Sequence, residues 1–580
     1  MVHTEGLGEL PRWELDSIYP GLESEPFQNA MTELSGQLDH LDQILDQYEA
    51  AQAVSAAAAS PEDEVEAFTR FIDCYLDRMN VIATENRKLH LYVQCIVDTD
   101  SSNSLAARRL SELDPFDIRI QRQTTRFQSW LRKKSELLNQ VISKSELARA
   151  HAFYLQSTAE QSRYMMSDAE EALAAELASS GLNAWFNLYT KIWSQLSVPF
   201  ERNGQHEELP LAEIQNIAML DPDGAVRERA ARAEAAAWAS MREPLAAALN
   251  GSKGAKIALN KRRGRMNSLH AALDEARIDP VTLEALLSAI QEALPSFRRY
   301  LKAKARLLGK ERLAWWDIFA PVGQADRQFP FSEAKAFILA QFESFSPHLA
   351  RFGRQAFDRH WIDAEPRAGK QGGAYCAGIP GMDLSRVLLN YDGSLRMIFC
   401  LAHELGHAYH NHCRAGKTRF QCASPMTLAE AASLFCETLV TEKARADAAS
   451  LQEELALLDT FLSGTAFVSV IETTQYFHFE KEVFERRSQA TLSADGICEI
   501  SLRWQAEIYG DSIEPQHLNP YAWVDIPHQF FPYISFYNFP YAFGLLFSLG
   551  LYAQYQRRGA AFTPEFEALL ASTGEFMPVE

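Results

Sequence analysis

The chain contains no C-x-x-C pair, although it has 8 cysteines in 580 residues. Cysteines that form neither close pairs nor a dense framework are typical of a reducing compartment, where the thiols are free and mostly buried. The start of the chain also lacks a basic segment followed by an apolar one, which is the pattern of an export signal. We therefore expect a cytoplasmic protein.

Positive charge is scarce as well. The 56 Lys and Arg residues stand against 76 Asp and Glu, which gives a formal net charge of −20. Such an excess of negative charge opposes nonspecific binding to phosphate backbones and to anionic lipid surfaces. The densest basic segment, residues 251 to 265, has no interleaved aromatic residues, so we expect a solvated helix face or a loop there. We expect neither nucleic acid nor a membrane as a partner, and the oligomeric state is left unpredicted.

No apolar run is long enough to cross a membrane without interruption. The longest uncharged run, residues 526 to 556, is broken by three prolines and by His528 and Asn538. A membrane-spanning helix needs about 20 consecutive apolar residues and has no water to satisfy broken backbone hydrogen bonds. We therefore predict a buried segment.

Helical periodicity dominates the rest of the chain. Between residues 27 and 48 the apolar side chains recur at steps of three and four, which predicts one face of an amphipathic helix. Asp279 followed by Pro280 is a typical helix start. A chain of this length is too long for one compact core, so two or more lobes are expected.

Strand candidates are few, and the clearest is the short apolar run at residues 385 to 391. Breaks are expected in the Ala-rich residues 50 to 63, at residues 197 to 210 and in the Gly-rich residues 365 to 383. The predicted strand comes shortly before a segment that is rich in histidine.

Four of the 15 histidines lie in that segment, "MIFCLAHELGHAYHNHCR". His403 and His407 are four residues apart, so on a helix both imidazoles can reach one cation. Glu404 can border the same metal without being a ligand. His410 lies about 10 Å along the helix axis from His403, too far for one tetrahedral ion to bind both. We expect His410 and His412 to be packed or to support the site from outside the ligand set.

A catalytic zinc takes three protein ligands and leaves one position for water. In the apolar helical pattern "PMTLAEAASLFCETLVTEKA", Glu430 and Glu437 lie two turns apart on one face. A buried carboxylate is costly unless it is paired or binds a metal. Glu430 is therefore the predicted third ligand of one zinc ion per chain. Glu437 is predicted to orient a ligand histidine, with an ordinary buried hydrogen bond or salt bridge as the alternative.

At these motifs the chain resembles the thimet oligopeptidase and oligoendopeptidase F family of metallopeptidases. "HELGHAYH" is similar to the zinc helix of that family, and "AEAASLFCE" is similar to the helix that carries its third ligand. "GKQGGAYCAG" and "VLLNYDGS" resemble segments that precede the zinc helix in the oligoendopeptidase F branch, and "IPHQFFPYISFYNFPYAFG" resembles its C-terminal segment. Weaker matches, "PRWELDSIYPG" and "WWDIFAPV", extend the similarity over nearly the whole chain.

The resemblance implies a mainly α protein whose two helical lobes flank a deep channel, with zinc at its floor and oligopeptides as substrates. To this we add a small β-sheet beside the HExxH helix, from the strand predicted above. We divide the chain into an N-terminal helical region, residues 1 to 195, and a zinc metallopeptidase region, residues 196 to 580. By motif, His528, Tyr537 and Tyr541 match family positions that contact the scissile carbonyl or nearby substrate atoms. Gly544 stands where the thimet branch has a further tyrosine.

Glu404 is predicted to act as the general base that takes a proton from the attacking water and passes it to the leaving amine. An extended peptide can add to an exposed strand edge near the site through backbone hydrogen bonds. Gly372 and Gly373 then permit close approach of the peptide, together with Ala374 and Tyr375 of the same segment, unless the glycines only form a turn.

Three functions remain open at this point. The first is a zinc endopeptidase that cleaves internal bonds of short oligopeptides. The second is a dipeptidyl carboxypeptidase on the same fold, which needs a cation to hold the terminal carboxylate of the substrate, and no sequence motif identifies one. The third is a peptide-binding protein that keeps the fold without the chemistry, although every residue that the mechanism requires is present.

Overall fold

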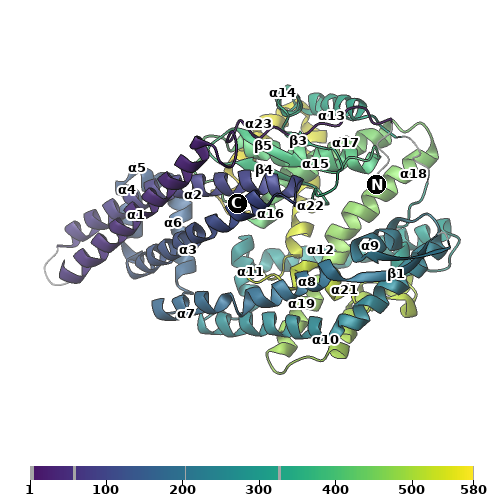
Figure 1. Cartoon of the computed structure of the whole chain (residues 1–580), viewed down its shortest axis with the longest axis horizontal. Coiled ribbons are helices and arrows are strands. Elements are labelled where there is room, and N and C mark those ends of the chain that lie inside the picture. Colours follow the sequence, from purple (N-terminus) through teal and green to yellow (C-terminus); the bar gives the residue numbers. More distant parts are fainter. Residues whose placement is uncertain (1–5, 56–59, 203, 324–327, 579–580) are drawn as a thin grey trace.

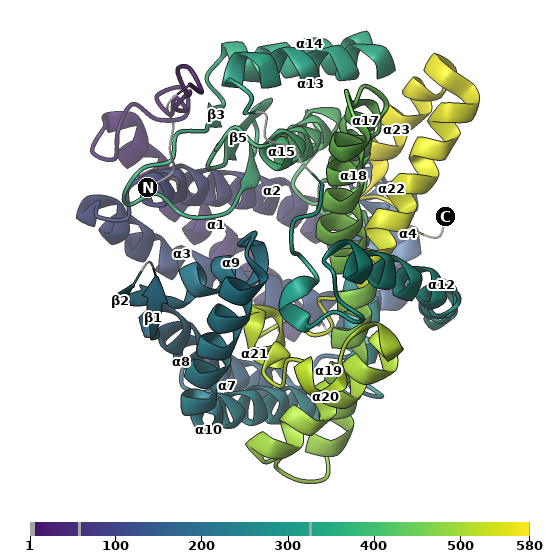
Figure 2. The same cartoon turned by 90° about the vertical axis from the view of Figure 1, so that its right-hand side faces the viewer.

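The computed structural model describes residues 6–55, 60–202, 204–323 and 328–578. Helices make up most of these residues, and the few strands form two small sheets, so the expected mainly α fold is confirmed (Figures 1 and 2). The N-terminal helices are α1 (Glu25–Ser55), α2 (Pro61–Thr99), α3 (Ser104–Lys133), α4 (Leu138–Lys144), α5 (Glu146–Ala150), α6 (Ala152–Ser162), α7 (Asp168–Ala178) and α8 (Leu182–Gln195).

The first three helices pack along one another because each presents an apolar stripe. On α1 the residues predicted from the periodicity, including Phe27, Leu34 and Leu38, are fully or almost fully buried. Ser60 and Asp63 form a capping box that starts α2. In Figure 1 these helices make an elongated layer, and α2 passes beside the sheet that contains β4 (Tyr375–Ile379).

Residues 197 to 210, expected to be a break, form a β-hairpin instead. Strand β1 (Ser197–Arg202) pairs antiparallel with β2 (Gln205–Pro210). In β1, Val198 and Phe200 are buried and alternate with exposed residues, and this alternation favours a strand over a loop. The hairpin leads into α9 (Leu211–Leu220), α10 (Gly224–Arg262), α11 (Ser268–Ala276) and α12 (Pro280–Leu307).

Two details of these helices bear on the sequence predictions. Asp279 caps α12 by accepting a hydrogen bond from the backbone of Thr282, as predicted. The prediction for the basic segment was wrong in part, because Lys253 and Lys256 of α10 are buried. The Lys253 ammonium lies 2.6 Å from the Glu480 carboxylate, and such pairing makes the burial of both charges tolerable.

The predicted strand at residues 385 to 391 is confirmed as β5 (Leu384–Leu388), the centre of a three-stranded sheet. β5 pairs in parallel with β3 (Ile362–Asp363) and antiparallel with β4. Because the strand order is β3-β5-β4, β4 is an edge strand. The sheet packs against α15 (Leu395–Cys413), the helix that carries the HExxH motif.

The remaining helices do not all adjoin the HExxH helix, and of these α13, α14, α17 and α23 contact it. α17 packs along α15, and α22 packs along α17 (Figure 2). These helices, with the π-helical segment η3, are α13 (Phe331–Phe345), α14 (Pro347–Asp358), α16 (Met426–Ala429), α17 (Ala431–Ala446), α18 (Leu451–Asp459), η3 (Thr460–Glu472), α19 (Thr473–Arg487), α20 (Ala494–Tyr509), α21 (Ala522–Asp525), α22 (Phe539–Arg558) and α23 (Thr563–Ser572).

One helical stretch in the described part of the chain, Leu451–Arg487, is long and apolar enough to cross a membrane by length and composition alone. Of its most apolar window, 44% is buried inside the molecule, as happens in a core helix, so this is weak support for a span. The apolar residues near the C-terminus contribute buried side chains from α22, among them Phe539, Ala542 and Leu545.

Candidate metal centre and active site

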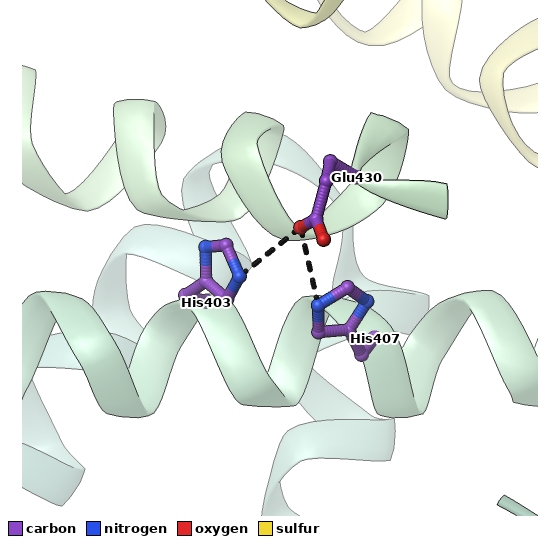
Figure 3. Close-up of side chains that lie close together, drawn as sticks. All are labelled: His403, His407 and Glu430. Atoms are coloured by element: carbon purple, nitrogen blue, oxygen red, sulfur yellow. Dashed lines mark ion pairs between the residues drawn. The ribbon is translucent and has the colours of Figure 1, made fainter. Parts of the chain in front are cut away.

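Helix α15 begins where Ser394 accepts a hydrogen bond from the backbone of Met397, and it continues unbroken through the motif. His403 and His407 therefore lie on one face, with their ring centroids 4.9 Å apart. Figure 3 shows both imidazoles directed toward the Glu430 carboxylate of the facing segment. The Glu430 Oε2 atom lies 3.2 Å from Nε2 of His403 and 3.3 Å from Nε2 of His407.

These distances fit a shared metal ion. Two donors that each lie about 2.0–2.1 Å from a tetrahedral zinc ion are about 3.3 Å apart. One ligand atom from each of the three residues falls within 4.8 Å of the others. Two imidazoles and one carboxylate also form a recurrent donor set for catalytic zinc. The residues present therefore fit the ion that the sequence predicts.

The pKa shifts of the cluster residues also favour a bound cation. Burial opposes ionisation of Glu430, yet the charge of His407 and hydrogen bonds from both histidines outweigh it and hold the pKa of Glu430 well below its usual value. Burial lowers the pKa of His403, but its hydrogen bonds to Glu430 and Glu437 raise that pKa well above the ordinary value. The site thus stabilises positive charge between these side chains, and a cation there would serve in place of the imidazole protons.

Gly406 explains how Glu430 comes so close to the histidine helix. A Cβ atom at this position would lie 2.6 Å from the carbonyl oxygen of Ala432 and 2.7 Å from Cα of Ser433. Both atoms belong to the backbone of α17, so no side chain can turn aside to make room. The glycine inside the HExxH motif is what lets α15 and α17 pack closely enough for one carboxylate to reach two imidazoles.

We expect Gly406→Ala to lower the free energy of unfolding by about 1–3 kcal/mol, the usual cost of overpacking a core. It should also reduce the metal content, since separating α15 from α17 moves Glu430 away from the histidines. Thermal unfolding and metal analysis measure both effects. Gly550→Ala is the matched control, because that helical glycine has open space around the added Cβ. A Gly406→Ala protein as stable and as metal-rich as the control would contradict this role.

Glu430 itself lies at the junction between α16 and α17. The Ser433 hydroxyl donates a hydrogen bond of 2.7 Å to the Glu430 carboxylate. Gly544 of α22 packs against the Glu430 stem, since a Cβ there would lie 3.2 Å from Cβ of Glu430. The glycine that stands in place of a tyrosine thus leaves room for the Glu430 side chain. Ser433 was not among the predicted site residues, although its place three residues after Glu430 could have indicated it.

Glu437 contacts His403, the first predicted ligand, as the sequence predicts for an orienting residue. Its carboxylate lies 2.9 Å from Nδ1 of His403, on the side of the ring opposite Glu430. Its other oxygen accepts a hydrogen bond of 2.7 Å from the Thr465 hydroxyl. Thr465 belongs to the π-helical segment η3, a distortion that is common at functional sites. A chain of hydrogen bonds therefore runs from Thr465 through Glu437 to His403.

We expect Glu437→Gln to lower zinc affinity about 10–100-fold, the usual cost of losing the partner of a ligand histidine. Thr465→Val should lower it less, because Glu437 keeps its contact with His403. Competition with a chromogenic chelator measures both affinities. If Glu437→Gln binds zinc as tightly as the unaltered protein, the carboxylate does not orient the ligand.

Glu404 lies on the same helix but outside the three-residue cluster. It is buried, with 6% of its surface exposed, and it accepts no hydrogen bond from the residues that the structure describes. Burial raises the pKa of Glu404, an effect that the charges of His403 and His407 oppose. A carboxylate with a raised pKa and a free oxygen beside a metal site is suited to proton transfer.

His528, Tyr537 and Tyr541 lie together in the structure. The ring of His528 is 4.7 Å from that of Tyr537 and 6.0 Å from that of Tyr541. Burial lowers the pKa of His528 to about 4, so the imidazole is neutral at neutral pH. Burial raises the pKa of Tyr541, and its interactions with Tyr537 and the charge of Glu430 add to that effect. Tyr541 therefore stays a hydrogen-bond donor.

The glycine-rich segment leads directly into the edge strand β4. Gly373 has a φ of +80°, a conformation that favours glycine, and neither Gly372 nor Gly373 has an atom within 4 Å of its Cβ position. Ala374 packs against the core beneath the sheet. The Tyr375 hydroxyl donates a hydrogen bond of 2.6 Å to Asp98 of α2. The segment therefore has open space at its two glycines.

The two later histidines of the motif segment lie away from the cluster. His410 is buried, and its Nε2 atom lies 2.8 Å from the Thr573 hydroxyl. His412 contacts Asp383 through Nδ1 at 2.8 Å. Among the described residues, neither belongs to the group of His403, His407 and Glu430.

Fold and site together define a mostly helical protein with an HExxH helix, a glutamate at the junction of the next two helices and a short sheet beside the HExxH helix. The comparisons with known proteins agree with this class. The model of peptidase family M3 matches residues 217–571, and that of the oligopeptidase F N-terminal domain matches residues 130–197. The chain belongs to peptidase family M3.

The relatives and solved structures carry related names. The chain is 26% identical over 353 residues to the group B oligopeptidase PepB of Streptococcus agalactiae and 29% identical over 280 residues to the chromosomal oligoendopeptidase F of Lactococcus lactis. These alignments cover 60% and 47% of this chain, and 57% and 45% of the two relatives. The structure of oligoendopeptidase-F from Enterococcus faecium superposes on this chain with a TM-score of 0.68 at 17% identity. The superposition covers 93% of this chain and 91% of the other, so the two proteins share a fold. A peptidase from Chlamydophila abortus gives a TM-score of 0.74 at 21% identity over 98% of this chain and 92% of the other.

Proposed function

We propose that this protein is a zinc endopeptidase that hydrolyses internal peptide bonds of short oligopeptides. The observation that carries the proposal is the spacing of His403, His407 and Glu430, whose donor atoms are separated as the ligands of one tetrahedral zinc ion are. Membership in peptidase family M3 supports peptide substrates. The oligomeric state is not part of the proposal.

His403, His407 and Glu430 would hold the zinc ion, which when bound would lower the pKa of a water molecule to near 7 and polarise the substrate carbonyl. Glu404 takes the remaining proton from the attacking water, because its buried carboxylate has no described partner that competes for it. The same carboxyl group then donates that proton to the departing amine nitrogen. Tyr541 and neutral His528 stabilise the negative charge that develops on the former carbonyl oxygen by donating hydrogen bonds. Tyr537 packs edge-on against both rings and holds their positions.

The substrate binds along the edge of β4 in this proposal. Extended peptides add to free strand edges through backbone hydrogen bonds, which do not depend on side-chain identity. β4 borders a cavity of about 800 Å³ that reaches His407. Gly372 and Gly373 leave the approach to this edge open. A site of this form accepts short flexible chains of varied sequence.

The proposal also covers the organisation of the chain. We assign the chemistry to residues 196 to 580 and the first wall of the substrate cavity to the helices of residues 1 to 195. All eight cysteines are free, which is consistent with a cytoplasmic protein.

A peptide blocked at both ends separates the endopeptidase from the dipeptidyl carboxypeptidase. An endopeptidase cleaves it, and mass spectrometry then shows two internal fragments. A dipeptidyl carboxypeptidase needs the free terminal carboxylate and leaves the blocked peptide intact while it releases dipeptides from the unblocked one. Cleavage of the unblocked peptide alone would therefore overturn the endopeptidase assignment and keep the metal chemistry.

A further inference from the structure

The cavity beside β4 carries positive charge in a protein whose net charge is −20. Three arginines line it, Arg87, Arg414 and Arg419, and the only carboxylate among its described lining residues is Asp98. The Asp98 carboxylate already accepts hydrogen bonds from Gln94 and from the Tyr375 hydroxyl. Asp98 therefore does not neutralise the arginines.

The three arginines differ in what they contact. Arg414, at the end of α15, donates to Asn411, Ser424 and a backbone carbonyl, so it is held in place by neutral groups. Arg87 and Arg419 are both exposed, and neither forms a hydrogen bond or an ion pair with a residue that the structure describes. Burial and the charge of Arg419 lower the pKa of Arg87, and the charge of Asp117 opposes this only in part. Two guanidinium groups thus face the cavity without a counterion among the described residues.

The relative direction of α2 and β4 shows at which end of the cavity Arg87 lies. One face of α2 lines it from Arg87 to Asp98, and Asp98 meets Tyr375 at the start of β4. At the other end, the Cβ position of Gly381 lies 3.1 Å from the Thr84 side chain, so α2 and β4 run antiparallel. Arg87 therefore lies beside the C-terminal end of β4.

The structure also gives the distance from the metal cluster to the arginine end of the cavity. Arg414 follows His407 by seven residues at the end of α15, which is about 10 Å along the helix. An extended peptide covers that distance in about three residues. Arg419 lies close enough to Arg414 for their charges to interact. A peptide along β4 with its scissile bond at the metal thus places a group about three to five residues away next to the arginines of this cavity.

We propose that Arg87 and Arg419 form a subsite for a carboxylate of the peptide substrate, about three to five residues from the scissile bond. The inference rests on the proposed function, since it places the scissile bond at the metal cluster. Guanidinium groups bind carboxylates through paired N–H donors, and such hydrogen bonds are stronger than neutral ones. A peptide that runs antiparallel to β4 brings its N-terminal residues to Arg87, so the carboxylate belongs to an acidic side chain. A peptide that runs parallel brings its C-terminal end there, and the terminal carboxylate is the ligand.

The test uses the full-length zinc-loaded protein and three sets of quenched fluorescent peptides. The first set is an uncharged parent peptide blocked at both ends. The second set compares Glu with Gln at each position about three to five residues from the cleaved bond. The third set compares peptides that end in a free carboxylate with peptides that end in an amide. We expect kcat/KM to be about tenfold or more higher for the carboxylate-bearing peptides of one set. The set that shows the preference identifies the source of the carboxylate.

The double variant Arg87→Gln, Arg419→Gln should bring the ratio of kcat/KM between charged and uncharged peptides close to one, whereas the control Arg229→Gln should leave the ratio unchanged. Replacing both arginines with Lys should keep part of the preference, because the charge remains. No preference in the unaltered protein, or the same preference in the double Gln variant, would overturn the proposal.

A binding measurement keeps this result separate from the proposed function. In the Glu404→Gln protein, fluorescence anisotropy gives the affinity for the same peptides without turnover. If this protein prefers carboxylate-bearing peptides and the Gln substitutions at Arg87 and Arg419 remove that preference, the subsite is supported. If the protein with Glu404 intact cleaves no peptide, that result counts against the proposed function alone. Equal binding of charged and uncharged peptides counts against the subsite.

Discussion

Glu404→Gln is expected to lower kcat for peptide cleavage by about 10²–10⁴, the usual contribution of a general acid–base group. The amide has nearly the same size as the carboxylate but cannot take a proton from water or return it to the amine. Glu404 lies outside the cluster of His403, His407 and Glu430, so the variant should bind zinc normally. Steady-state kinetics and metal analysis on the same sample measure the two properties.

The control for this variant is Glu485→Gln, an exposed glutamate of α19 far along the chain from the motif. It removes one negative charge without touching the cluster, and its kcat should match that of the unaltered protein. If Glu404→Gln keeps more than a tenth of the activity, Glu404 is not the base. If it loses zinc as well as activity, Glu404 contributes to the assembly of the site and its role in proton transfer is unsupported.

Glu430→Ala is expected to have the largest effect on metal binding. The change removes the one carboxylate that contacts both histidines among the described residues. Zinc affinity should fall by more than the about 10–100-fold that is typical for loss of an outer hydrogen-bond partner. Cleavage should fall with it, because the remaining two imidazoles leave the ion with too few protein ligands. Chelator competition gives the affinity, and added zinc should restore activity only at high concentration.

Glu442→Ala provides the comparison on the same helix. Glu442 pairs with Arg445 on the surface of α17, and its removal should leave both zinc affinity and cleavage unchanged. Unfolding curves of both variants show whether the fold survives. Unchanged zinc affinity in a folded Glu430→Ala protein would exclude Glu430 as a ligand.

Much of the site could be predicted from sequence because its key residues lie on α15 or at the start of α17. The spacing of His403 and His407 defines a common face, and the apolar surroundings of Glu430 make its charge costly without a partner. The strand at residues 385 to 391 was also visible, since a short apolar run between turn-forming segments is typical of a buried strand. These features depend on local periodicity, which the sequence displays directly.

Other features depend on contacts between distant segments. Thr465 supports Glu437 only because η3 folds back onto α17, and no local pattern announces that contact. Arg87 and Arg419 are separated by more than half the chain, and their shared cavity appears only when α2 packs beside β4. Lys253 was expected on a solvated face because its neighbours in sequence are basic, yet Glu480 pairs with it in the core.

Gly406, inside the HExxH motif, is another residue whose role depends on a contact with a distant segment. The sequence shows a glycine between Glu404 and His407, where alanine would favour the helix more. Only the position of α17 reveals that the backbone of Ala432 and Ser433 occupies the space of a Cβ atom. The identity of this residue is therefore explained by the packing of two helices and not by helix propensity.

The most direct test of the account is the zinc content of the unaltered protein, measured together with peptide cleavage before and after removal of the metal. We predict one zinc ion per chain, loss of cleavage when a chelator removes it, and recovery when one equivalent of zinc is returned. A metal-free protein that cleaves peptides at the same rate would contradict the assignment of His403, His407 and Glu430 as the metal centre.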